Sequence, residues 1–327
     1  MTPERRHAAV LSCACVPLVL AAILTAGEPA GRAGRLPQPS PRPAFTLIRE
    51  HRYRMAAGIR PFLLFWITRD NVGGARLVWR SGPSGERGYE LTIGSDPKRA
   101  PRAINRWGYL DEFAGPDGSG TVVGVMKQTD EQSIEEAKAK LAKENQEGYF
   151  FKMIRQSVGP GETTCDVVTL HVTTDFSYRE LDPLLKAFST DPGVTRTRRA
   201  KLAPSTRPGF LVAVAELVGE SVEAARGATP GRSVQVARTI PFTFSTTAYD
   251  LRLVSSEYLE SARFGGQSFT HVVRDQFETL NHETNGREQF TLVCGLDGVY
   301  REVPVFISYQ PRWWFKAELV IDQGDVF

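Results

Sequence analysis

An aromatic and basic cluster near the end of the chain is the part of this sequence best suited to binding a ligand. The stretch YQPRWWFKAEL places Trp314 between Arg312 and Lys316. If it is a β-strand, its side chains alternate, so Trp313 enters the core and Trp314 shares the outer face with both cations. Cations are attracted to the face of an indole ring. We therefore predict a binding site at Trp314, Arg312 and Lys316; packing of Trp314 under a helix or loop is the alternative.

A second cluster of the same kind lies in the stretch INRWGYLDEF. Arg106, Trp107 and Tyr109 could line the rim of a binding cleft, although a packed loop would explain the same residues. Asp111 and Glu112 follow directly. Two carboxylates about 5–10 Å apart across a cleft would suit a hydrolase, whereas an ordinary surface position is the alternative for such acids.

The other reactive residue types indicate neither a catalytic centre nor a metal site. The five histidines form no H-E-x-x-H motif and no zinc-spaced pair with cysteine. The sequence contains no G-x-S-x-G elbow, phosphate-binding glycine loop, EF-hand loop or dinucleotide fingerprint. Ser95 and Lys98 match S-x-x-K in letters only, because Pro97 favours a turn where that chemistry needs a helix. We predict no catalytic residue, no metal and no cofactor.

Two cysteines lie in the body of the chain, Cys165 and Cys294. An exported protein can join such a pair in a disulfide. Closing a loop of about 130 residues could stabilise the fold by roughly 4–5 kcal/mol. Each cysteine also lies in an apolar stretch, where a free buried thiol is equally expected. Both interpretations stay open.

The beginning of the chain is typical of an export signal. Arg5 and Arg6 precede an apolar run, Ala8–Gly27, which ends in small residues. We predict a signal peptide over residues 1–27, with an uncleaved anchor as the alternative. Residues 28–44 are rich in proline, glycine and arginine and predict a flexible linker. The protein is therefore expected in the periplasm or secreted, near a membrane through its N-terminus if the anchor remains.

Composition excludes some classes of partner. The chain has 327 residues, 41% of them apolar, with 40 basic and 37 acidic side chains and a net charge of +3. This is ordinary globular composition, and the charge is too balanced for a nucleic-acid-binding surface. We expect a single β-rich domain over residues 45–327 and no nucleic-acid partner.

Short strand patterns dominate this domain. FLLFWI and ARLVWR flank the polar glycine stretch RDNVGG, which predicts a turn, and GFLVAVAELVG predicts a further strand. Asn285-Gly286 predicts a two-residue hairpin that places Phe277 opposite Cys294 and Thr279 opposite Leu292. Alternation then puts four side chains of this hairpin inside: Phe277, Phe290, Leu292 and Cys294.

Two helices are expected within an insertion around residues 129–188. Thr129–Asn145 has capping-box spacing and a thin apolar stripe. A second helix is expected near SYRELDPLLKAFS, where four apolar residues share one face. The basic stretch Thr190–Gly209 has no regular apolar pattern and predicts a loop joining two halves. The predicted fold class is mainly antiparallel β, barrel-like or a strongly curved sheet, with two accessory helices.

Three short motifs carry a resemblance to a known family. VPVFI (Val303–Ile307), FKAEL (Phe315–Leu319) and DNVGGARL (Asp70–Leu77) resemble an uncharacterised exported bacterial domain of unknown function, the 3108 type. The resemblance covers the two ends of the mature chain. It implies an antiparallel β-barrel-like fold exported to the cell envelope, and it implies no reaction.

These observations favour a non-catalytic function. Curved antiparallel sheets enclose cavities lined by side chains. We predict an exported envelope protein that binds an apolar or amphipathic ligand, such as a lipid, or another envelope protein. A hydrolase acting on envelope polymers, with a cleft rimmed by Trp107 or Trp314, is the first alternative. A structural scaffold without a ligand is the second.

Overall fold

The computed structural model describes residues 45–60, 65–100, 105–127, 136, 139, 151–170, 194–234, 236 and 238–323. The predicted signal peptide and linker lie outside these residues. So do the two predicted helices, except that Glu136 and Ala139 are helical. Those assignments therefore stay predictions.

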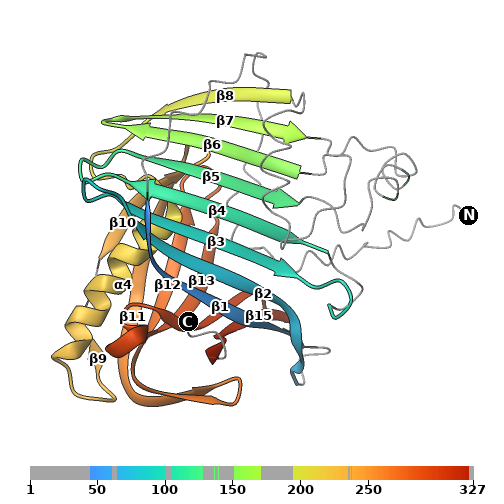
Figure 1. Cartoon of the computed structure of the whole chain (residues 1–327), viewed down its shortest axis with the longest axis vertical. Helices are drawn as coiled ribbons and strands as arrows, with labels where there is room; N and C mark the ends of the chain where they lie inside the picture. Colours follow the sequence, from blue (N-terminus) through green and yellow to red (C-terminus); the bar gives the residue numbers. More distant parts are fainter. Residues whose placement is uncertain are drawn as a thin grey trace, which may run out of the picture.

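One antiparallel β-sheet forms the body of the protein (Figure 1). Its strands follow the order β10-β11-β12-β13-β14-β15-β1-β2-β3-β4-β5-β6-β7-β8, and β9 pairs with β11. The strands are β1 (Thr46–Ile59), β2 (Ile67–Ser81), β3 (Arg87–Ser95), β4 (Trp107–Ala114), β5 (Gly120–Lys127), β6 (Phe151–Gly159), β7 (Glu162–Leu170), β8 (Val194–Lys201), β9 (Ser233–Val234), β10 (Thr239–Phe244), β11 (Thr247–Phe264), β12 (Gln267–Asn281), β13 (Arg287–Gly295), β14 (Pro304–Arg312) and β15 (Phe315–Ile321). A short 3₁₀ helix, η3 (Gly298–Tyr300), precedes β14. Pairing of β1 with β15 joins the two ends of the described chain.

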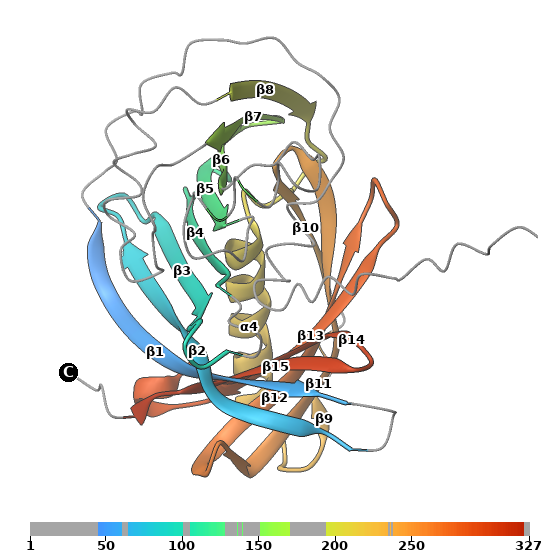
Figure 2. The same cartoon turned by 90° about the vertical axis from the view of Figure 1, so that its right-hand side faces the viewer.

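The sheet curls around helix α4 (Phe210–Arg226) without closing into a barrel, and β10 and β8 are its two edges (Figure 2). The predicted mainly antiparallel, curved β-structure is confirmed at this level. The prediction of two accessory helices is not confirmed. Helix α4 is the only complete α-helix among the described residues, and it lies outside the predicted insertion. It packs against β10–β13 and against β3 and β4, so the core lies between the helix and the concave face.

The predicted strand GFLVAVAELVG is wrong, because these residues begin α4. Its first half is apolar at nearly every position and therefore fits a buried strand or a buried helix equally well. The second half of the helix distinguishes the two. Its buried residues recur at helical spacing: Leu217, Ser221, Val222 and Ala225. The concave sheet supplies apolar surface on several sides of this helix.

Two predicted connections are also corrected. The expected turn at RDNVGG lies within β2 (Ile67–Ser81) as an irregularity of the strand: Asn71 has φ of 55°, and the pairing with β1 shifts register between Met55 and Ala57. Gly73 is there for close approach, since a Cβ on it would lie 2.2 Å from the carbonyl oxygen of Gly94 on β3. The basic segment expected to be a loop contains strand β8, whose backbone pairs with β7.

In the β12–β13 hairpin the predicted side chains point inward, but the strands pair in a different register from the one predicted. Phe277 pairs with Phe290, and Cys294 pairs with Val273. The four expected inner side chains are all buried: Phe277, Phe290, Leu292 and Cys294. The register moves by an even number of residues, which preserves the faces. The loop is longer than two residues because Asn281 Oδ1 accepts the backbone N–H groups of Glu283 (2.8 Å) and Thr284 (3.1 Å).

Replacing Asn281 by alanine is expected to lower the free energy of unfolding by about 1–2 kcal/mol, because two loop N–H groups lose their acceptor. Asn281 Nδ2 also donates to the Tyr249 hydroxyl at 3.2 Å. Chemical denaturation measures the change. Asn285→Gly is the control: Asn285 is exposed with φ of 55°, which glycine adopts readily, so its stability should stay within about 0.5 kcal/mol. Equal losses in both variants would contradict this account of the loop.

Both body cysteines are free, buried thiols, so the disulfide interpretation is wrong and the free-thiol interpretation is the one realised. They lie on strands from opposite ends of the sheet order, β7 and β13. Cys165 Sγ lies 3.9 Å from Ser245 Oγ. Cys294 pairs with Val273 and Pro304, and burial raises its pKa well above the ordinary value. A thiol of this kind is unreactive.

Candidate ligand cavity beneath helix α4

A buried glutamate positions the beginning of α4. Glu112 on β4 accepts the N–H groups of Phe210 (2.9 Å) and Val212 (3.0 Å), which an α-helix leaves without intrahelical partners. Gly209, the N-cap residue, permits this contact because a Cβ there would lie 2.3 Å from Glu112 Cδ. Burial raises the pKa of Glu112 to about 8, against the opposing effect of the helix N–H groups.

The loop before α4 is held by a second buried polar residue and by an ion pair. Gln156 on β6 donates to the carbonyl oxygens of Pro208 (2.9 Å) and Thr243 (3.2 Å). Arg207 binds Glu216 of α4 through two parallel bonds of 2.5 and 2.8 Å, a geometry that fixes orientation as well as distance. The start of the helix is therefore tied to both halves of the sheet.

The C-terminal half of α4 is anchored by a buried cluster of hydroxyls and one acid. Ser221 donates to Asp275 Oδ1 at 2.6 Å and lies 2.8 Å from the hydroxyl of Ser256. Burial raises the pKa of Asp275 to about 6, and its second oxygen has no hydrogen-bond partner. Polar contacts at both ends of α4 thus fix the distance between the helix and the sheet.

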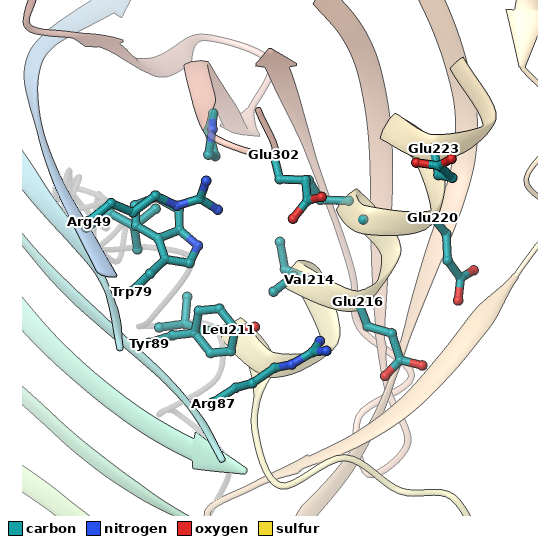
Figure 3. A pocket seen from close by; sticks show the side chains of 15 residues that line it. Arg49, Trp79, Arg87, Tyr89, Leu211, Val214, Glu216, Glu220, Glu223 and Glu302 are labelled. Carbon is teal, nitrogen blue, oxygen red and sulfur yellow. The ribbon is translucent and has the colours of Figure 1, made fainter. Parts of the chain in front are cut away.

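A cavity of about 440 Å³ lies between α4 and the concave face of β1–β3 (Figure 3). Leu77, Trp79 and Tyr89 form the sheet wall, and they are nearly buried. Leu211 and Val214 of α4 face them across the cavity. This volume suits a small ligand. Nine of the fifteen lining residues are uncharged and six are charged, so the cavity offers both apolar and ionic contacts.

Arg49 of β1 is the most distinctive polar group of the cavity. Its guanidinium lies over the Trp79 ring, 4.5 Å from the centroid, and donates to the carbonyl oxygen of Arg301 at 2.7 Å. Its Nε is buried without a partner. No carboxylate of the described chain lies within ion-pair distance of it; burial lowers its pKa, and the charge of Glu302 opposes this shift. A cation held this way can accept an anionic ligand group.

The cavity also has glutamates on its helix side, and arginines outside the cavity neutralise them. Glu216 binds Arg207 and Arg238, and Arg238 also pairs with Glu220. Arg226 and Arg301 form ion pairs with the other two acids. Glu223 pairs with both arginines, and Glu302 lies 3.3 Å from Arg301. On the sheet side, Arg87 is exposed and hydrogen-bonds Tyr89. The lining charges that remain without an ion-pair partner are therefore positive, and they are Arg49 and Arg87 on the sheet side.

The predicted rim residues Arg106, Trp107 and Tyr109 do not line this cavity. Trp107 and Tyr109 are buried in β4, on the face opposite to Glu112 and α4. Arg106 is half-buried, and its backbone N–H bonds Ser95 Oγ at 2.9 Å. The acids Asp111 and Glu112 are buried rather than exposed. As strand neighbours they point to opposite faces and cannot flank one substrate.

The predicted cluster around Trp314 is a turn rather than a continuous strand. Trp313 and Trp314 connect β14 to β15, and this exchanges their expected environments. Trp313, expected in the core, is 56% exposed, whereas Trp314 packs partly buried against the core beside Phe315. Lys316 lies over the ring of Trp66, 5.3 Å from its centroid, and pairs with Glu318. The local turn breaks the alternation on which the prediction rested.

Sequence reasoning missed the residues that line the cavity. Leu77 and Trp79, two residues apart on β2, and Tyr89 on β3 carry a strand-period signal for one face. The sheet wall could therefore have been predicted from the sequence. The opposite wall could not, because the residues of α4 were predicted to form a strand.

Comparisons with known proteins give little further identification. No family model and no curated protein matches the chain. A crystal structure of a β-barrel-like protein of the domain of unknown function DUF1849 from Brucella abortus matches with a TM-score of 0.41 and 9% identity. The match covers 84% of this chain and 95% of that one. A similarity at this level assigns no function, and the resemblance to the 3108 type in particular stays a prediction.

The described residues contain no group of three or more His, Cys, Asp or Glu side chains arranged to hold a metal ion. No helix among them is long and apolar enough to cross a bilayer.

Proposed function

We propose that this chain is an exported, non-catalytic binding protein of the cell envelope whose cavity takes an amphipathic ligand with an anionic head group. The observation that carries the proposal is Arg49, which lies on Trp79 at a cavity with apolar walls and has no ion-pair partner in the described chain. The apolar part of the ligand would pack against Leu77, Leu211 and Val214. Its anionic group would bind Arg49.

The charge arrangement supports an anionic over a cationic ligand. A cation would need a free carboxylate, yet each glutamate of the lining already has an arginine partner. An anion would meet Arg49 without displacing an existing ion pair. Charge-assisted bonds to guanidinium are among the stronger polar contacts, particularly away from bulk water.

Dodecanoate is a suitable probe, with dodecanol as its uncharged counterpart. We expect calorimetry to detect dodecanoate binding and Arg49→Gln to weaken it about tenfold, the loss of one charge-assisted contact. Dodecanol binding should change little in that variant. Arg252→Gln, an exposed site on β11, is the matched control and should bind both probes like the parent chain.

Filling the cavity tests its location. Val214 is partly buried on the helix wall, so Val214→Trp should reduce binding of both probes by at least about tenfold while the melting temperature stays near that of the parent. Failure of the parent chain to bind either probe, or unchanged binding in Val214→Trp, would remove the cavity as the site. Native mass spectrometry of the protein purified from its host's envelope should additionally show a bound amphiphile.

A further inference from the structure

The β1–β2 hairpin and the β14–β15 turn end on the same side of the molecule (Figure 2). Ile59 of β1 pairs with Ile67 of β2 and with Phe315 of β15, and the N–H of Arg60 donates to the carbonyl oxygen of Trp314 at 2.8 Å. We call the residues at this end with exposed apolar side chains the hairpin tip: Ile59, Phe65, Ile67 and Trp313.

Four of the eight exposed large hydrophobic residues of the described chain lie at the tip. Its four side chains are 41% (Ile59), 60% (Phe65), 49% (Ile67) and 56% (Trp313) exposed. Trp66 lies on the opposite face of the hairpin, since a Cβ on Gly58 would lie 3.2 Å from its ring. Apolar groups of the described residues therefore occupy both faces of this projection. Such a shape fits insertion into a soft apolar layer better than docking on one flat surface.

Basic residues surround the tip. Arg60, Arg69 and Arg312 lie on the three chain segments that form it, and none of them has an ion-pair partner in the described chain. Asp70 and Glu318 are the nearby acids, and Glu318 is already paired with Lys316. The tip thus combines exposed aromatic side chains with a positive excess. Tryptophan and arginine are the residues favoured where a protein meets lipid headgroups.

We infer that the hairpin tip docks the protein on an anionic lipid bilayer. Trp313, Phe65, Ile59 and Ile67 enter the boundary between headgroups and acyl chains, and the three arginines bind lipid phosphates. The attraction is electrostatic in part, so it weakens as salt screens it. The inference does not depend on the ligand of the cavity, which lies beneath α4.

Vesicle co-sedimentation tests this, with the chain from Glu28 onward, which omits only the predicted leader and retains every described residue. We expect it to pellet with vesicles of equal parts phosphatidylglycerol and phosphatidylcholine, and much less with phosphatidylcholine alone. The double variant Phe65→Asp, Trp313→Asp should bind at least about tenfold more weakly. The matched control is Leu47→Asp, Ile48→Asp, which adds the same charges at side chains 57% and 61% exposed near the other end of β1 and should keep binding.

The arginines form a separate arm of the experiment. Arg60→Gln, Arg69→Gln and Arg312→Gln should each weaken binding to the anionic vesicles about fivefold, which corresponds to about 1 kcal/mol per cation near such a surface. Arg252→Gln should have no effect.

Several results would overturn the inference. The first is that the parent chain does not sediment with the anionic vesicles. The second is that the two double variants lose vesicle binding to the same extent. The third is that the parent chain binds neutral and anionic vesicles equally. If ultracentrifugation instead showed a dimer that Phe65→Asp, Trp313→Asp dissociates, without vesicle binding, the tip would be a contact between copies of this chain. Melting temperatures of all variants confirm that they fold.

Discussion

Replacing Gly209 by alanine is expected to lower the free energy of unfolding by about 3 kcal/mol or more. The new methyl group would lie 2.3 Å from both Cδ and Oε2 of Glu112, far inside van der Waals contact. Glu112 is fully buried and cannot move aside without losing its bonds to the N–H groups of Phe210 and Val212. Overpacking and unsatisfied buried polar groups each cost about 1–3 kcal/mol. The backbone at Gly209 is extended, so the effect comes from crowding alone.

Helix α4 provides its own control in Gly219. This glycine lies inside the helix, and a Cβ there would meet no atom within 4 Å. Gly219→Ala should therefore raise the free energy of unfolding by about 0.5–1 kcal/mol through helix propensity. Thermal denaturation of both variants tests the account. If Gly209→Ala melted with the parent chain, the close contact between Glu112 and the start of α4 would not exist.

The stability of the parent chain is expected to fall as the pH rises from about 4.5 to about 8. Glu112 has a pKa of about 8 in the folded chain and an ordinary value of 4.5 when unfolded. Between these values the folded chain holds a proton that the unfolded chain has released, so raising the pH favours unfolding. The full effect is on the order of 4–5 kcal/mol, since one pKa unit corresponds to about 1.4 kcal/mol.

Asp275 acts in the same direction over a lower range, because its pKa rises from 3.8 to about 6. His51 acts in the opposite direction, because burial lowers its pKa from the ordinary 6.5, and its contribution is complete once the pH is above that value. The interval from pH 7 to 8 therefore reports mainly on Glu112. Denaturant titrations across this interval should show a slope of up to about 1.4 kcal/mol per pH unit, which Glu112→Gln should abolish. At pH 6 this variant should be less stable than the parent by about 1–2 kcal/mol, since its amide presents a donor to one helix N–H. The difference should shrink by pH 8.5.

Glu260→Gln, on the exposed side of β11, is the matched control and should keep the slope of the parent chain. An unchanged slope in Glu112→Gln would show that another group titrates in this interval. The two predictions about this contact are independent, since one depends on crowding at Gly209 and the other on the proton of Glu112.

The inner faces of individual strands could be predicted from the sequence. The burial of Phe277, Phe290, Leu292 and Cys294 follows from alternation alone, because a strand's side chains point to opposite faces in turn. The antiparallel, curved class of the fold followed in the same way from many short strands. The register of the β12–β13 hairpin did not, because the side chain of Asn281 selects a longer loop than the Asn-Gly pair predicts.

The candidate site could not be predicted, because its walls come from segments far apart in the chain. Arg49, Trp79 and Val214 lie on β1, β2 and α4, and no local pattern relates them. The apolar start of α4 is compatible with strand or helix, and only the concave sheet decides between them by surrounding it. The exchange of Trp313 and Trp314 has a similar origin, since pairing of β15 with both β1 and β14 fixes where the strand begins.

Alternation of side chains is a local property, so the sequence alone was enough to predict a β-rich chain whose strands have definite inner faces. Tertiary structure decided which faces meet. It placed Glu112 at the start of α4, held the helix above Trp79, and left Trp313 exposed. The physical reason is that burial and hydrogen bonding depend on partners distant in the sequence, whereas periodicity depends only on neighbours.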